Sequence, residues 1–76
     1  MINYPFNLKV TYVSNIDSPI STSESTHHIK DISDVEVVCG FINCYSELTW
    51  NESMLFTVMI AGKYQGETES IVFDIV

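Results

Sequence analysis

A run of regularly spaced polar or small residues between positions 36 and 47 constrains the fold most. They follow one another at intervals of four, three and four residues: Glu36, Gly40, Asn43 and Glu47. On a helix of 3.6 residues per turn, these intervals place the side chains within about 60° of each other. The opposite side then carries the apolar residues Val35, Val38, Cys39, Ile42 and Tyr45. The pattern therefore predicts a helix from Asp34 to Leu48.

The residues just before this helix match a capping box. In the segment Ser33-Asp34-Val35-Glu36, the serine hydroxyl accepts a hydrogen bond from a first-turn amide while Glu36 reaches back to the cap. Acidic residues in the first turn also lie at the positive end of the helix dipole. We therefore expect Ser33 to be the N-cap, so that Ser33→Ala would cost about 1 kcal/mol of stability.

The N-terminal part of the chain reads as a strand followed by a loop. Residues 6–13 place apolar side chains at alternate positions, namely Phe6, Leu8, Val10 and Tyr12, which is typical of a half-buried strand. Residues 14–25 are rich in Ser, Asp, Asn and Pro, which favour turns, so we expect a loop there. Residues 26–30 predict a short second strand.

After the polar break at residues 49–53, the apolar run Met54–Ala61 predicts a central strand. Residues 62–66 begin and end with glycine and predict a hairpin loop. Residues 67–76 predict a last strand, which we expect at an edge of the sheet because Glu69 and Asp74 place charges on both of its faces. The predicted fold is α+β: a single domain over residues 1–76, with an antiparallel sheet of three or four strands packed on one helix in the order β-(β)-α-β-β.

Composition limits the classes of partner. Ten acidic residues against three lysines and no arginine give a formal net charge of −7, which disfavours binding to nucleic acid and to anionic membranes and favours basic partners. A basic leader segment and a membrane-length apolar run are not found in the sequence. We therefore expect a cytoplasmic protein that binds neither nucleic acid nor membrane.

The residues that usually carry chemistry are too few and too scattered to predict an enzyme. Cys39 and Cys44 lack the spacing of redox or zinc motifs, and we expect free, buried thiols rather than a disulfide or half of a metal site. His27 and His28 are adjacent, so on a strand they point to opposite faces and do not chelate one metal ion. The sequence predicts no catalytic residue, no metal site and no cofactor.

The function that remains is interaction with another protein. As a category, a minimal α+β fold with excess carboxylate and no active site resembles the short acidic proteins of viruses and plasmids. Such proteins act against host machinery, and those of phages can counter host defence. We expect an inhibitor or adaptor that binds a basic surface, with charge from Asp31, Asp34, Glu36 and Glu47 and aromatic anchors at Trp50 and Tyr64. Two alternatives stay open: a nucleic-acid mimic that occupies a basic channel, and a structural homo-oligomer such as a homodimer.

Overall fold

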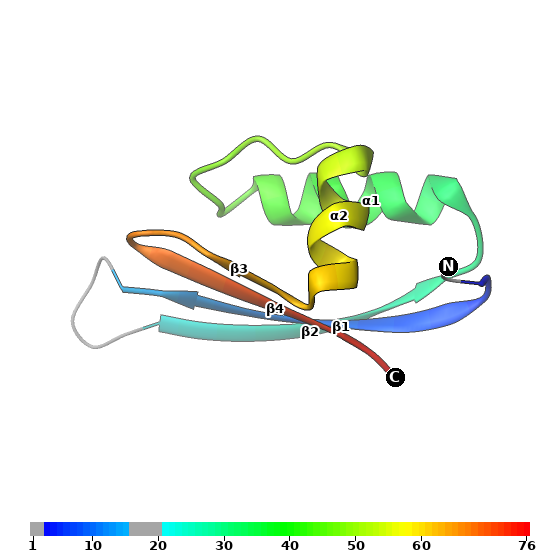
Figure 1. The fold of residues 1–76 in the computed structure, drawn as a ribbon, viewed down its shortest axis with the longest axis horizontal. Coiled ribbons are helices and arrows are strands. Elements are labelled where there is room, and N and C mark those ends of the chain that lie inside the picture. The colour runs from blue at the N-terminus through cyan, green and yellow to red at the C-terminus, as the bar shows by residue number, and fades with distance from the viewer. Residues whose placement is uncertain (1–2, 16–20) are drawn as a thin grey trace.

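The computed structural model describes residues 3–15 and 21–76. They form two layers, in which both helices lie on one face of a four-stranded antiparallel sheet (Figure 1). In chain order the elements are β1 (Phe6–Ser14), β2 (Ser21–Ile29), α1 (Ile32–Asn43), α2 (Glu52–Ala61), β3 (Lys63–Gln65) and β4 (Glu69–Ile75). The strands are arranged β2-β1-β4-β3. The predicted α+β class and antiparallel sheet are confirmed, with two helices instead of one.

Strand β1 lies inside the sheet and confirms the strand predicted for residues 6–13. It pairs with β2 from Phe6↔Ile29 to Ser14↔Ser21 and with β4 from Leu8↔Ile75 to Ser14↔Glu69. Its alternate side chains are buried beneath the helices: Phe6, Leu8, Val10 and Tyr12. Period-two alternation thus defines one core face of the sheet.

The opposite face of the sheet is polar, and none of the described elements covers it. Lys9 of β1 lies there between its cross-strand neighbours Thr26 on β2 and Asp74 on β4. Its Nζ is 3.5 Å from a carboxylate oxygen of Glu24, also on β2. Charges of alternating sign therefore follow one another across three strands of this face.

Helix α1 confirms the predicted helix, although it begins and ends earlier than expected. Its buried side is the predicted one, formed by Val35, Val38, Cys39 and Ile42. The capping box is wrong, because the N-cap is Asp31, whose carboxylate accepts from the Ser33 backbone amide at 3.0 Å. Ser33 lies inside the first turn and donates its hydroxyl to Asp31. A carboxylate two residues earlier satisfies the free amides, so the helix starts at Ile32.

Helix α2 replaces the strand predicted for Met54–Ala61, so that prediction is wrong. The Asn51 side chain caps the first turn by accepting from the Met54 amide at 2.9 Å. Gly62 ends the helix in the left-handed conformation with φ of 87°, which glycine adopts without steric cost. Leu55 and Met59, one turn apart, are the buried residues of this helix. Caps at both ends therefore outweigh the strand propensity of the run.

The remaining differences concern strand boundaries. The loop predicted for residues 14–25 is wrong at Ser14, which ends β1, and from residue 21 onwards, where β2 begins; its residues 16–20 lie outside the described part of the chain. The short strand predicted at residues 26–30 is confirmed as part of β2. Within the hairpin loop predicted at residues 62–66, residues 63–65 form β3. Because β3 pairs with β4, the last strand is internal and not at an edge.

Candidate functional site

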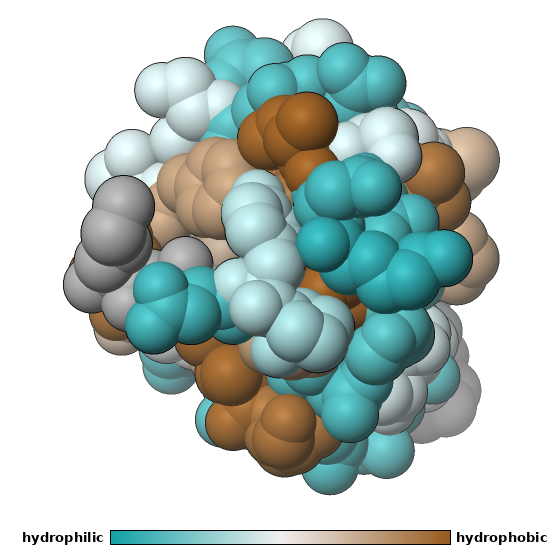
Figure 2. Space-filling model, turned by 90° about the vertical axis from the view of Figure 1, so that its right-hand side faces the viewer, coloured by the Kyte–Doolittle hydropathy of each residue, from teal (hydrophilic) through white to brown (hydrophobic). Residues whose placement is uncertain are grey.

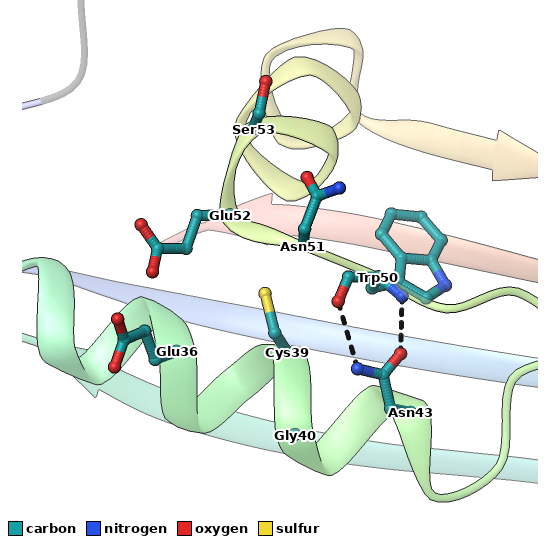
Figure 3. A pocket seen from close by; sticks show the side chains of 8 residues that line it. All are labelled: Glu36, Cys39, Gly40, Asn43, Trp50, Asn51, Glu52 and Ser53. Atoms are coloured by element: carbon teal, nitrogen blue, oxygen red, sulfur yellow. Dashed lines mark hydrogen bonds between the residues drawn. The ribbon is translucent and has the colours of Figure 1, made fainter.

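A groove of about 580 Å³ lies between α1 and the start of α2 (Figure 3). One wall comes from α1 and the other from the segment that leads into α2. The lining residues are Glu36, Cys39, Gly40, Asn43, Trp50, Asn51, Glu52 and Ser53. Apart from its chain neighbours and the nearby backbone of α1, no described atom lies within 4 Å of where a side chain would begin on Gly40, so the glycine keeps this part of the wall open.

Asn43 holds the two walls together. Its side-chain amide donates to the Trp50 carbonyl at 3.0 Å, and its side-chain oxygen accepts from the Trp50 backbone amide at 2.6 Å (Figure 3). One asparagine side chain thus pairs with both the backbone amide and the backbone carbonyl of Trp50, two residues before α2 begins. Because Asn51 then caps α2, the position of the second wall follows from two consecutive polar contacts.

Two carboxyl groups face each other across the groove, Glu36 from α1 and Glu52 from the first turn of α2 (Figure 3). The pKa of Glu52 is raised by hydrogen bonding to the Glu36 carboxyl, then by loss of surrounding solvent and by repulsion from the Glu36 charge. The ion pair found among the described residues joins Lys9 and Glu24. In that part of the chain, neither Glu36 nor Glu52 is paired with a cationic side chain. The groove is therefore negative and uncompensated.

Cys39 directs its thiol toward the same groove (Figure 3). Burial raises its pKa, and the nearby charges of Glu52 and Glu36 raise it further. The thiol therefore stays protonated at neutral pH, whereas the thiolate is the nucleophilic form. Both cysteines are free thiols. Cys39 is buried as predicted, whereas the prediction of a buried thiol is wrong for Cys44, which is exposed at the C-cap of α1.

A buried carboxylate orders the loop that connects α1 to α2. Glu69, at the start of β4, is 1% exposed. It accepts from the Ser46 hydroxyl at 2.8 Å, the Glu47 amide at 3.0 Å and the Tyr12 hydroxyl at 3.3 Å. Ser46 Oγ in turn accepts from Trp50 Nε1 at 2.9 Å. Burial, followed by the Glu69 charge, raises the pKa of Tyr12, which keeps that hydroxyl a donor.

The acidic residues predicted to bind a partner do not form one site. Asp31 caps α1, and Asp34 accepts from the Lys30 amide at 2.8 Å. Glu47 accepts from the hydroxyl of Thr68, the residue before β4. Of the four predicted carboxylates, Glu36 is the one that lines the groove.

The two predicted aromatic anchors form part of the packed interior. Trp50 is 3% exposed, so its indole packs in the core, where it contacts the Phe73 ring and, at right angles, the Tyr64 ring. Tyr64 is half-buried against this indole. Trp50 therefore shapes the groove from within and does not present its ring to a partner.

Sequence reasoning missed Glu52, Asn43 and Asn51 as site residues. The signal that could have found them is the segment Asn51-Glu52-Ser53 directly before an apolar run, because Asn followed by an acidic residue is a common helix start. Identifying that helix would have placed Glu52 at its N-terminus. Its meeting with Glu36 depends on how the two helices pack, which no local pattern records.

Comparisons with known proteins bring no further identification. No protein family, curated protein or solved structure matches this chain. Over the described residues, no three His, Cys, Asp or Glu side chains come together in a group that could hold a metal ion. Likewise, no helix in that part of the chain is long and apolar enough to cross a membrane.

Proposed function

We propose that this protein is an acidic interaction module that binds a basic segment of a partner protein, with an arginine or lysine side chain inserted between Glu36 and Glu52. The observation that carries the proposal is the pair of facing carboxylates, which raises the pKa of Glu52 without a described cation beside it. Like charges held together by a fold repel, and a bound cation relieves that repulsion. The pair therefore gains more from a cation than two separate carboxylates would.

The shape of the groove supports a side chain as the ligand. Its volume of about 580 Å³ falls within the range of pockets that bind small groups. Polar residues rim it at Asn43, Asn51 and Ser53, and the stem of a long side chain would pass over the wall left open by Gly40. An arginine fork offers five donors in a plane and suits a double carboxylate.

The distribution of charge favours this local site over a phosphate mimic. Glu24 and Asp74 lie on the open face of the sheet beside Lys9, whereas Glu36 and Glu52 line the groove on the helical side. A mimic of a nucleic-acid backbone needs a regular row of charges along one surface. The raised pKa of the Cys39 thiol also supports binding rather than nucleophilic catalysis in the groove.

A double substitution with a matched control tests the proposal. Isotope-labelled protein is titrated with a short arginine-rich peptide, and amide shifts are followed by NMR. We expect the shifts to concentrate on residues 36–43 and 51–53 and to disappear in Glu36→Gln/Glu52→Gln. The control Glu67→Gln/Asp74→Asn removes the same charge at exposed positions elsewhere and should keep them. Shifts spread evenly over the surface, or equal in both variants, would contradict the proposal.

A pull-down extends the same comparison to natural partners. Wild type, the groove variant and the control variant are each immobilised and exposed to host lysate. Proteins retained by wild type and control but lost from the groove variant are the expected partners. Retention of the same proteins by all three forms would mean that the groove is not the binding site.

A further inference from the structure

A chain of hydrogen bonds connects the buried carboxylate of Glu69 to the wall of the groove that carries Glu52. Ser46 Oγ donates to Glu69 at 2.8 Å and accepts from Trp50 Nε1 at 2.9 Å. Asn51, the residue after Trp50, is the N-cap of α2, and Glu52 is the first residue of that helix. Glu69 is the first residue of β4, so these bonds link the sheet to the start of α2.

The buried members of this network can adopt few other arrangements. Glu69 and Trp50 are both buried, so a polar atom that lost its partner there would not be compensated by water. The Tyr12 hydroxyl and the Glu47 amide also donate to the Glu69 carboxylate. Among the described residues, every buried side-chain nitrogen and oxygen atom has a hydrogen-bond partner. The carboxylate therefore fixes the direction of the Ser46 hydroxyl, and the serine fixes the position of the indole.

Trp50 is held from two directions, and each contact fixes a different part of the residue. Asn43 of α1 pairs with its backbone amide and carbonyl (Figure 3). These two bonds hold the walls together, but the chain that follows could still turn about them. The bond from the indole to Ser46 removes this freedom, because it holds the side chain in one direction. The direction in which Glu52 leaves this segment then follows from both contacts.

The placement of Glu52 matters because the proposed binding depends on charge. A cation gains from both Glu36 and Glu52 only while both carboxylates lie within about 4–6 Å of it. At the end of the molecule drawn in Figure 2, hydrophobic side chains reach the surface in separate patches among hydrophilic ones, so no single apolar face there takes over the role of charge. The contacts that hold Glu52 opposite Glu36 therefore bear directly on affinity.

We propose that Glu69 is a positioning residue of the groove: through Ser46 and the Trp50 indole, it holds Glu52 opposite Glu36. The proposal rests on the proposed function where it concerns binding, whereas the arrangement of the two carboxylates is a property of the free protein. Glu69 belongs to the sheet and does not line the groove, so it acts without touching the ligand. A change in the network should therefore alter the opposition of the carboxylates while the lining residues stay the same.

The opposition of the two carboxylates can be measured without a ligand. Hydrogen bonding to the Glu36 carboxyl raises the pKa of Glu52, and an NMR pH titration of the Glu52 carboxyl carbon reports that pKa. We expect Ser46→Ala, which breaks the link without changing any charge, to lower the pKa toward its ordinary value of 4.5. Ser46→Thr keeps the hydroxyl and should keep the raised pKa.

Val10→Ala is the control for a loss of stability alone. It shortens a buried side chain of β1 and removes no side-chain hydrogen bond, so the pKa of Glu52 should stay raised while circular dichroism shows a folded protein. Glu69→Gln alters the first member of the network and should act like Ser46→Ala. A pKa of Glu52 that stays raised in both network variants, or that falls as far in Val10→Ala, would overturn the proposal.

Titration with the arginine-rich peptide tests the consequence for binding. We expect the dissociation constant to rise about tenfold in Ser46→Ala and to stay near the wild-type value in Ser46→Thr and Val10→Ala. An unchanged dissociation constant in Ser46→Ala would contradict the positioning role. If the peptide binds none of these forms, wild type included, the proposed function fails, whereas the pKa comparison still decides whether Glu69 positions Glu52.

Discussion

Replacing the buried Glu69 by glutamine should lower the stability of the fold, and the hydrogen-bond geometry sets the magnitude. Ser46 Oγ accepts from Trp50 Nε1 at 2.9 Å and from the Leu48 amide at 3.2 Å. Both of its lone pairs are therefore used, and its proton must go to Glu69, at 2.8 Å. In Glu69→Gln, one of the two carboxylate oxygens becomes an NH2 donor, which faces either the Ser46 hydroxyl or the Glu47 backbone amide. Either orientation places a donor against a donor, because the serine cannot accept a third bond and the amide cannot accept at all.

The hydrogen bond lost in Glu69→Gln is one to a charged group, and such bonds contribute about 1.5–3 kcal/mol to the free energy of unfolding. Glutamine is cheaper to bury than a carboxylate, so we expect a net loss near the lower bound, about 1.5 kcal/mol. With a urea dependence of about 1 kcal/mol per molar for a chain of this size, the midpoint should fall by about 1.5 M. The fluorescence of Trp50, the single tryptophan of the chain, reports the transition.

Glu67→Gln provides the matched control for this experiment. It makes the same chemical change two residues earlier, at an exposed position, where an effect within about 0.5 kcal/mol is expected. If both variants unfold at the same urea concentration, the hydrogen bonds of Glu69 do not hold the α1–α2 loop, and the reasoning is refuted.

Three further predictions concern the helices and the groove. Gly40→Ala should stabilise the protein by about 0.5–1 kcal/mol in urea unfolding, because Gly40 is inside α1 with open space around it; a loss would contradict that placement. Asp31→Ala should lower the free energy of unfolding by about 1 kcal/mol, and Ser33→Ala clearly less in the same assay, since Asp31 is the N-cap. A larger loss in Ser33→Ala would mean that Ser33 is the N-cap after all. The pKa of Glu52 is raised in the fold, so its contribution to stability is present at low pH and is lost as pH rises above the ordinary value of 4.5. Glu36→Gln should therefore be more stable than wild type at pH 7, with the difference shrinking toward pH 4; thermal melts that differ equally at both pH values would contradict this.

Periodic segments could be predicted from the sequence, and the uniformly apolar one could not. The alternation at residues 6–13 predicts a strand, and the four-three-four spacing in α1 predicts a helix. Each pattern is readable because the element buries one face and exposes the other. The run Met54–Ala61 is apolar almost throughout and has no period to read. Its identity is set by its caps, Asn51 and Gly62, which carry more information than the run itself.

The edge strand β2 illustrates a different limit. Its first residues are Ser- and Thr-rich and favour turns locally, yet they pair with β1 over the full length of both strands. Strand formation there depends on the partner more than on intrinsic preference. The candidate site shows the same limit. The sequence predicts Glu36 as an exposed acidic residue, but its position opposite Glu52 depends on how the two helices pack.

The strand arrangement has a consequence for synthesis of the protein on the ribosome. The first strand, β1, lies beside the last, β4, and β4 is also the only described partner of β3. The N-terminal hairpin can pair early, but one edge of β1 waits for a partner until nearly the whole chain has emerged. Contacts between distant segments form slowly, so the closing step of folding is the docking of the C-terminal hairpin. A chain that stops before β4 leaves the apolar face of β1 without its neighbour and is a natural substrate for chaperones and proteases.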